Sequence, residues 1–190
     1  MRIENDAYYT PASVAQQVFD HLMPFVCKSP KTVLDPACGG LALLTPAYYK
    51  YEKARIIGID VSAVSPNIEI DAYQADFLDE NLTLESISCR EKVDLIVTNP
   101  PYSQAIDFLE KSLTFAKTVV SLHRLDFLAS KKRHAFFQKN IPSIVSVLPQ
   151  RPSFVGKGTD RYDYCWIVLN GGGNRITDLM WMPIKDNKNT

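Results

Sequence analysis

Short runs of apolar, largely β-branched residues recur along the chain and predict the strands of one sheet. They occupy residues 31–34, 54–60, 68–73, 93–98, 118–122, 144–148 and 162–169. Apolar residues at helical spacing lie between them, over 12–23, 41–53 and 105–115. The pattern predicts an α/β fold with a mostly parallel sheet of seven strands and helices on both faces. The last two strands are expected to form an antiparallel hairpin at one end.

Three local features refine these elements. Thr10 is expected to cap the first helix, with Pro11 at its first position. Pro46 is compatible with the next helix only if it lies in the first turn, because proline lacks a backbone N–H. The segment 62–67 is too short for the helix that usually joins the second and third strands of such a fold.

Composition favours one domain and sets limits on its partners. The 190 residues suit a single domain, expected over 1–184, with a flexible tail over 185–190. Lys plus Arg equals Asp plus Glu at 21 each, so any binding of nucleic acid requires a local basic patch. No apolar run is long enough for a membrane span, and the polar start is unlike a signal peptide, which favours the cytoplasm. The four cysteines lack metal-ligand spacing and are expected as free thiols, with no metal.

One strand is followed at once by Asn99-Pro100-Pro101-Tyr102. Two prolines remove two backbone donors and fix two φ angles, so the chain leaves the sheet stiffly. An amide side chain, a prolyl carbonyl and an aromatic ring then stand at the carboxyl end of a strand. Open α/β sheets bind their ligands at that edge.

Acidic residues follow three other strands. Asp35 opens the loop Asp35-Pro36-Ala37-Cys38-Gly39-Gly40, whose glycines allow the backbone to approach a ligand. An acid here can accept hydrogen bonds from an ammonium group. Asp60 ends the second strand, about twenty residues later, where an acid can accept the hydroxyls of a ribose. Asp76 and Phe77 follow the third strand.

Four of these motifs together resemble the adenine-N6 DNA methyltransferases that use S-adenosylmethionine. They are Tyr9-Thr10-Pro11, the Asp-Pro-x-Cys-Gly loop, Asn99-Pro100-Pro101-Tyr102 and Arg151-Pro152-Ser153-Phe154. The resemblance covers most of the chain, without the separate target-recognition domain of larger members. It implies a Rossmann-like class I methyltransferase fold. Leu41 stands where the family usually has a further glycine, so we expect it either to crowd the cofactor or to shift the loop.

The resemblance also implies a role for each motif. Tyr9 and Thr10 would contact the methionine end of the cofactor, and Asp35, Ala37, Cys38 and Gly39 would form its loop. Asp60 would hold the ribose, while Asp76 and Phe77 would hold the adenine. Asn99 and the Pro100 carbonyl, supported by Pro101, would hold the exocyclic amine of the target adenine. Tyr102 and Phe154 would pack on the target base.

The implied substrate is duplex DNA with the adenine flipped out of the helix. The basic residues Lys131, Lys132, Arg133 and Lys157 are candidates for contacts with the phosphate backbone. A solvated helix face explains the first three equally well. Sequence recognition would come from loops or from a partner subunit.

Two alternatives stay open at this point. Related enzymes with Asn-Pro-Pro-Tyr methylate RNA adenine or protein glutamine, which keeps the chemistry and changes the acceptor. A degenerate, non-catalytic module that binds DNA or a partner would also fit Leu41 and the short segment after Asp60.

Overall fold

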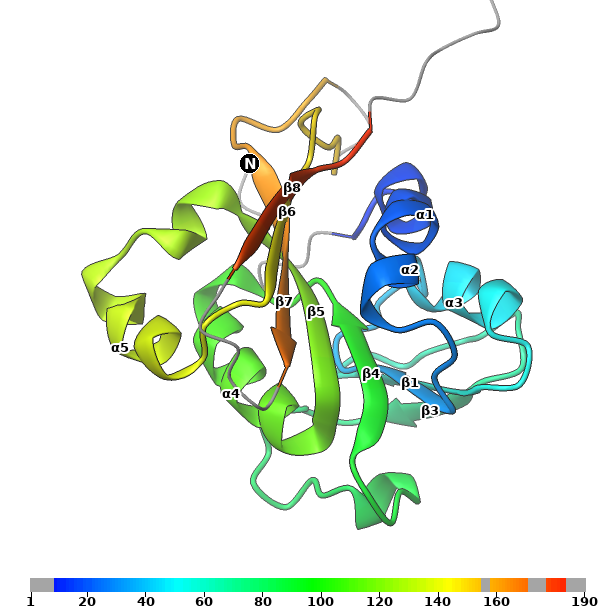
Figure 1. The fold of residues 1–190 in the computed structure, drawn as a ribbon. Helices are drawn as coiled ribbons and strands as arrows, with labels where there is room; N and C mark the ends of the chain where they lie inside the picture. The colour runs from blue at the N-terminus through cyan, green and yellow to red at the C-terminus, as the bar shows by residue number, and fades with distance from the viewer. Residues whose placement is uncertain (1–8, 155–157, 171–176, 184–190) are drawn as a thin grey trace, which may run out of the picture.

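One eight-stranded sheet organises the molecule, in the order β3-β2-β1-β4-β5-β7-β6-β8 (Figure 1). The computed structural model describes residues 9–154, 158–170 and 177–183. The strands are β1 Thr32–Asp35, β2 Arg55–Asp60, β3 Asp71–Gln74, β4 Val93–Thr98, β5 Ala116–Arg124, β6 Ile144–Val147, β7 Tyr164–Asn170 and β8 Asp178–Trp181. The predicted α/β class is confirmed.

The sheet is parallel from β3 to β5 and mixed beyond it. β1 to β5 pair in parallel, whereas β7 is antiparallel to both β5 and β6. The predicted antiparallel hairpin at one end is therefore confirmed, with β7 inserted between β5 and β6. The carboxyl ends of β1, β2 and β4 share one edge because these strands run the same way.

The prediction of seven strands was wrong by one. The eighth, β8, pairs in parallel with β6, with Ile144 opposite Asp178 and Val147 opposite Trp181. Its four residues, Asp-Leu-Met-Trp, carry no β-branched side chain. Strand propensity alone could not find it, because the strand is held by the exposed ladder of β6.

Helices cover both faces of the sheet, as predicted (Figure 1). They are α1 Ala12–His21, α2 Met23–Val26, α3 Leu44–Lys50, α4 Ala105–Phe115 and α5 Lys131–Lys139. Helices α1 to α3 pack in one apolar core with buried Phe19, Leu44 and Trp166. Helices α4 and α5 pack in a second core with Phe108 and Phe136.

Of the expectations for individual helices, the one for Pro46 is confirmed and the one for Thr10 is wrong. Pro46 lies in the first turn of α3, where its missing N–H is tolerated. Ser130 caps α5 by accepting a hydrogen bond from the Lys132 N–H. The expected Thr10 cap was wrong: Pro11 is the N-cap residue, α1 begins at Ala12, and no side chain caps it. The Pro11 carbonyl instead accepts the first helical hydrogen bonds from the N–H groups of Val14 and Ala15.

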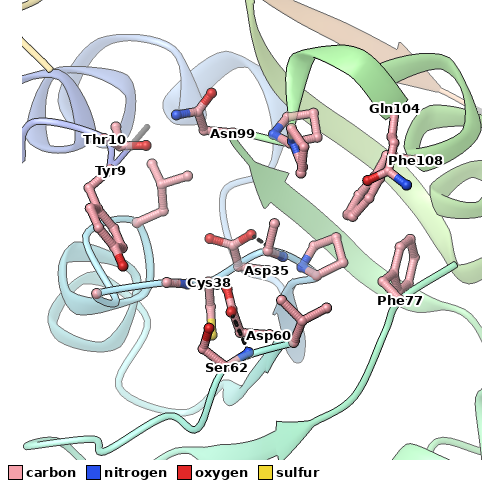
Figure 2. A pocket seen from close by; sticks show the side chains of 18 of the residues that line it. Tyr9, Thr10, Asp35, Cys38, Asp60, Ser62, Phe77, Asn99, Gln104 and Phe108 are labelled. Carbon is pink, nitrogen blue, oxygen red and sulfur yellow. Dashed lines mark hydrogen bonds between the residues drawn. The ribbon is translucent and has the colours of Figure 1, made fainter. Parts of the chain in front are cut away.

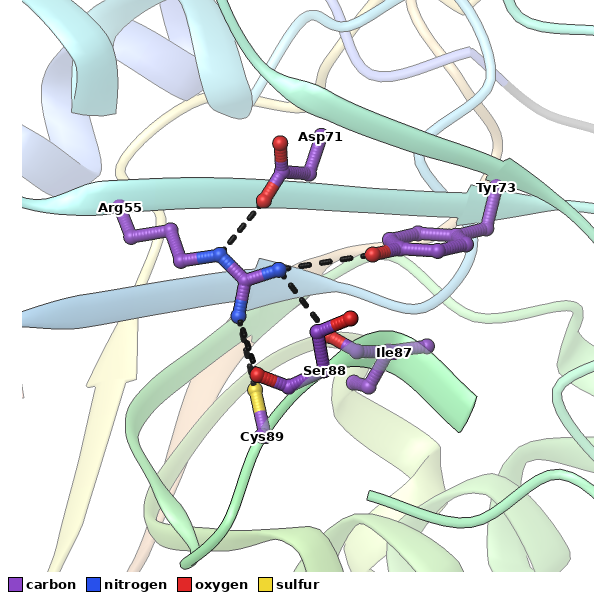
Figure 3. A network of polar contacts seen from close by, with 6 residues as sticks. All are labelled: Arg55, Asp71, Tyr73, Ile87, Ser88 and Cys89. Carbon is purple, nitrogen blue, oxygen red and sulfur yellow. Dashed lines mark hydrogen bonds and ion pairs between the residues drawn. The ribbon is translucent and has the colours of Figure 1, made fainter. Parts of the chain in front are cut away.

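No helix joins β2 to β3, as the short segment predicted. Arg55 holds this part of the sheet together (Figure 3). Its guanidinium pairs with Asp71 of β3 and donates to the carbonyls of Ile87 and Ser88 at 3.0 Å each. These contacts connect β2 to β3, which leads into Asp76 and Phe77, and to the segment around Ile87 and Ser88 that precedes β4.

The four cysteines are free, as expected. Among the described residues, no helix has the length and apolar character to cross a membrane, and no cluster of His, Cys, Asp or Glu has metal-binding geometry. The expected tail over 185–190 and the candidate Lys157 lie outside the described residues.

Candidate active site

A cleft of about 1290 Å³ opens at the carboxyl ends of β1, β2 and β4. It brings together the two sets of residues that the sequence predicted separately. Its lining includes Tyr9, Thr10, Asp35, Ala37, Cys38, Gly39, Asp60, Asp76, Phe77, Asn99, Pro100, Pro101 and Tyr102. Figure 2 shows Asp35 near the centre, Tyr9 and Thr10 on one side, and Phe77 on the other.

Asp35 is the buried acid of the cleft. It ends β1, is only 2 % exposed, and accepts a hydrogen bond from the Ala37 N–H at 3.1 Å. Burial raises the pKa of Asp35 to about 7, against the opposing influence of the Thr98 hydroxyl and the Ala37 N–H. A cation placed beside this carboxylate in the cleft would restore its ionised form. The site is therefore suited to an ammonium group.

The glycine loop brings its backbone close to Tyr9. Gly39 has a φ of +44°, and a Cβ added there would lie 2.9 Å from a ring carbon of Tyr9. Only glycine fits this position without strain or a clash. The ring of Tyr9 is 64 % exposed although it lies on the loop, so it forms an open wall of the cleft.

Leu41 does not crowd the cleft. Its backbone is left-handed, with a φ of +64°, and its side chain is 5 % exposed and packs in the apolar core with α1 and α3. It is not among the residues that line the cleft. Glycine suits this position because the backbone there is left-handed. Leu41 adopts this conformation at a cost of about 1 kcal/mol, which burial of its side chain offsets. Of the two alternatives for Leu41, crowding does not agree with this orientation of its side chain.

Asp60 organises the loop from the end of β2. Its carboxylate accepts hydrogen bonds from the Gly39 N–H at 2.8 Å and from the Ser62 N–H at 2.9 Å. Both carboxylate oxygens thus hold backbone groups at the cleft, and each has a further lone pair to accept a ligand hydroxyl. Ser62 also lines the cleft, and sequence reasoning missed it because no motif includes it.

Cys38 lines the cleft as a packed thiol. Its side chain is 4 % exposed, and its sulfur lies 3.0 Å from the place where a Cβ on Gly58 would stand. Burial, with the nearby Asp35 and Asp60 carboxylates, raises the pKa of the Cys38 thiol. A protonated thiol is a poor nucleophile, which agrees with a structural role.

Phe77 and Phe108 form the apolar end of the cleft (Figure 2). Their ring centroids are 5.4 Å apart, and Phe115 packs on Phe77 at 5.2 Å. Asp76 is exposed beside them and accepts a hydrogen bond from the Leu78 N–H. The helical stripe of α4 explained Phe108 as core, so its contribution to the cleft was missed, as was that of Gln104.

Asn99, Pro100, Pro101 and Tyr102 leave β4 along the rim of the cleft. The Tyr102 hydroxyl donates to the Tyr164 hydroxyl at 3.2 Å, and Tyr164 donates to Asp160 at 3.0 Å. Burial and the hydrogen bond to Tyr164 raise the pKa of the Tyr102 phenol, so it stays neutral. The ring is thus held in one orientation by its hydroxyl.

Four predicted site residues lie away from the cleft lining. The ring of Phe154 packs on that of Tyr164, with centroids 5.1 Å apart. Lys131 and Lys132 are exposed on α5. Arg133, on the same helix, stacks on Phe127 at 4.6 Å and donates to the Asp126 carbonyl. The structure does not bring these residues together with the cleft, and their predicted roles in binding DNA stay predictions.

Comparisons with known proteins agree with this architecture. Residues 3–145 match the family described as N-6 DNA Methylase. Type II methyltransferase M.CvrRI of Paramecium bursaria Chlorella virus XZ-6E is 22% identical over 94% of this chain. Type II methyltransferase M.VspI of Vibrio sp. (strain 343) is 30% identical over 55% of this chain. The chain spans 58% of the first relative and 27% of the second.

Solved structures give the same fold. A protein from Listeria monocytogenes, assigned as a class I S-adenosylmethionine-dependent methyltransferase, superposes with a TM-score of 0.72 at 15% identity, over 97% of this chain and 69% of its own. The methyltransferase subunit of a type I restriction-modification system from Streptococcus thermophilus has a TM-score of 0.72 at 17% identity, over 92% of this chain and 47% of its own.

The sheet order and the cleft at its carboxyl edge define the class I methyltransferase fold. Within that class, the match over more than half of the chain identifies the family. The chain belongs to the N-6 DNA Methylase family.

Proposed function

We propose that this protein transfers a methyl group from S-adenosylmethionine to the N6 amine of adenine in DNA. The observation that carries the proposal is that Asp35, Asp60 and Asn99 line the same cleft. A cofactor loop and an amide that can hold an amine therefore face the same space. Membership of the N-6 DNA Methylase family supports the same reaction.

The residues of the cleft fit S-adenosylmethionine. The buried Asp35 carboxylate, with its raised pKa, suits the ammonium of the methionine part. Asp60 retains lone pairs for the ribose hydroxyls. Exposed Asp76 can accept from the adenine amine, and Phe77 offers an apolar surface beside it. Tyr9 and Thr10 are assigned to the methionine end.

When bound, the cofactor supplies an electrophilic methyl group on a sulfonium. The chain's own task is to prepare the nucleophile. The lone pair of an exocyclic adenine amine is delocalised into the ring, so the amine is a weak nucleophile. The Asn99 side-chain oxygen and the Pro100 carbonyl are assigned to hold its two hydrogens and direct the lone pair toward the methyl group. Catalysis then depends on fixed dipoles and positioning, without a strong base.

A base inside a duplex cannot enter this cleft, so the proposal includes flipping of the adenine. Tyr102 is assigned to stack on the base, and Phe154 to support the aromatic wall through Tyr164. The basic residues Lys131, Lys132, Arg133 and Lys157 are assigned to the phosphate backbone. The likeness to a type I restriction-modification methyltransferase subunit supports a partner subunit that contributes sequence recognition.

The experiment is a transfer assay with tritiated S-adenosylmethionine on unmethylated genomic DNA, total RNA and protein extract in parallel. Label in DNA, recovered as N6-methyldeoxyadenosine, is the expected result. Label found only in RNA or only in protein would show that this molecule, and not DNA, is the acceptor. The assignment as a methyltransferase would still stand. Absence of cofactor binding in calorimetry would favour the non-catalytic alternative.

A further inference from the structure

The planar guanidinium of Arg124 packs against two tyrosine rings, one of which lines the cleft. The central guanidinium carbon lies 4.6 Å from the centroid of the Tyr102 ring and 4.1 Å from that of Tyr162. Arg124 ends β5, and β5 runs parallel to β4, so the guanidinium stands at the same edge as Asn99 and Pro100. Tyr102 itself lines the cleft.

Contacts with hydroxyl groups orient this arrangement. The Arg124 Nε–H donates to the Tyr164 hydroxyl at 3.4 Å, and the same hydroxyl accepts from Tyr102 and donates to Asp160. Tyr164 is fully buried and begins β7, directly opposite Arg124 in the sheet. Tyr102 therefore has a fixed position, because its hydroxyl is held by a residue of the core.

Arg124 is stacked rather than ion-paired. Within the described parts of the chain, the ion pairs with carboxylates involve Arg55, Lys117 and Arg151, and none involves Arg124. A guanidinium held by aromatic faces and one long hydrogen bond, without an ion pair, can leave those faces when another flat group takes its place there. Its charge remains available to an anion that approaches the cleft.

We propose that the slot between Tyr102 and Tyr162 receives the target base, and that Arg124 moves out of it to the phosphate backbone beside that base. This inference rests on the proposed function and names the second aromatic face for the substrate. A nucleobase is flat like a guanidinium and has two faces that stack on aromatic rings. Exchange of one for the other preserves both stacks, and the displaced cation gains a charge-assisted contact with phosphate.

The inference assigns Tyr162, and not Phe154, to the second face of the base. Phe154 packs on the buried Tyr164 ring and so supports the wall from behind. Tyr162 is 37 % exposed, and it lies in the segment that leads into β7, where a substrate can reach it.

The slot can be tested without turnover, with single-stranded probes that need no flipping. The probes are a fluorescent strand of about twelve deoxyadenosines, a length within the site sizes of single-strand binding proteins, and an abasic strand of equal length. Wild type should bind the adenine strand more tightly than the abasic strand. Tyr162→Ala should reduce that preference by about 10-fold, the loss expected for one stacking partner. Tyr162→Phe should keep it.

The matched pair for the arginine is Arg124→Gln and Arg161→Gln. Arg161 is exposed and only one residue from Tyr162. Loss of a phosphate contact should lower the slope of log affinity against log salt by about 1 in Arg124→Gln, but not in Arg161→Gln. Calorimetry with S-adenosylmethionine should give equal affinity for all four variants, which shows that the cleft is intact.

Two results would overturn the slot. One is an unchanged preference for adenine in Tyr162→Ala, and the other is a wild-type protein that binds both probes equally. Methyl transfer to DNA is measured separately on the wild type. If wild type methylates DNA and Tyr162→Ala keeps the full preference for the adenine strand, only the slot is refuted. If wild type does not methylate DNA but its preference for the adenine strand depends on Tyr162, only the proposed reaction is refuted.

Discussion

Asp35→Asn should make the protein more stable and at the same time weaken its binding of S-adenosylmethionine. The carboxylate is buried at the end of β1, and its pKa is raised from 3.8 to about 7, chiefly by burial. Above pH 7 the folded protein must hold this charge away from water. Asparagine has nearly the same shape, and it removes the charge.

The magnitude follows from the pKa difference between the unfolded and the folded protein. A raised pKa means that the folded state binds the proton more tightly, so ionisation of Asp35 disfavours folding as pH rises from about 4 to 7. The difference of about 3 pH units corresponds to about 4 kcal/mol at pH 8, at 1.36 kcal/mol for each unit. At pH 5 the same relation leaves about 2 kcal/mol.

Urea unfolding of the wild type and of Asp35→Asn at pH 8 and pH 5 measures this directly. The variant should be more stable by up to about 4 kcal/mol at pH 8 and by about half of that at pH 5. Calorimetry should show cofactor affinity that rises with pH toward 7 in the wild type, since an ammonium requires the ionised carboxylate. The variant should bind more weakly, without this dependence on pH.

Asp94→Asn is the matched control. Asp94 lies at the opposite end of the sheet, on β4, and accepts from Lys117 Nζ and from the Lys31 N–H at 2.7 Å each. Partial burial opposes these contacts, but together they lower the pKa of Asp94. This variant should lose stability at pH 8 and keep its cofactor affinity. Greater stability in Asp94→Asn, or reduced stability with full cofactor affinity in Asp35→Asn, would refute the reasoning.

Three further predictions concern the loop and the core. Leu41→Ala should cost about 2–4 kcal/mol in urea unfolding, because a buried side chain is lost, yet leave cofactor affinity unchanged in calorimetry, because that side chain faces away from the cleft. Weaker cofactor binding in that variant would contradict the orientation of Leu41. Gly39→Ala should do the reverse, since a left-handed alanine costs only about 1 kcal/mol but its Cβ displaces Tyr9 from the cleft; normal cofactor affinity would count against the Tyr9 wall. His123 is fully buried and stacked on Phe127 at 4.0 Å, and burial, with Arg133 nearby, lowers its pKa from 6.5 to about 3. Because the unfolded state binds the proton first, wild type should lose about 2 kcal/mol between pH 7 and pH 5 through this group, and His123→Phe should escape that loss in urea titrations; equal losses would remove His123 as the cause.

The sequence predicted the residues of the cleft better than it predicted the last strand of the sheet. Asp35, Asp60 and Asn99 each follow a run of β-branched residues, and parallel strands bring their carboxyl ends to one edge. The sequence order therefore contained the spatial arrangement. Strand β8 had no such signal, because its pairing depends on a neighbour more than thirty residues away in the chain.

The direction in which a side chain points was the second feature that the sequence could not predict. Leu41 lies in the loop, and nothing in its neighbours told whether it enters the cleft or the core; the left-handed backbone decides this. Phe108 is the opposite case. Helical spacing predicted it as a core residue, but in the structure it also lines the cleft. The Arg124 stack joins β5 to the rim loops at β4 and before β7, and no local pattern encodes it.

The proposed amine clamp is tested most directly by Asn99→Ala. The measurement is mass spectrometry of N6-methyldeoxyadenosine in unmethylated genomic DNA after incubation with protein and S-adenosylmethionine, with cofactor affinity measured on the same samples. The account predicts methylated adenine with the wild type, and at least about a 100-fold lower rate with Asn99→Ala at similar cofactor affinity, as for loss of one transition-state hydrogen bond. Methylation at the wild-type rate in Asn99→Ala would contradict it.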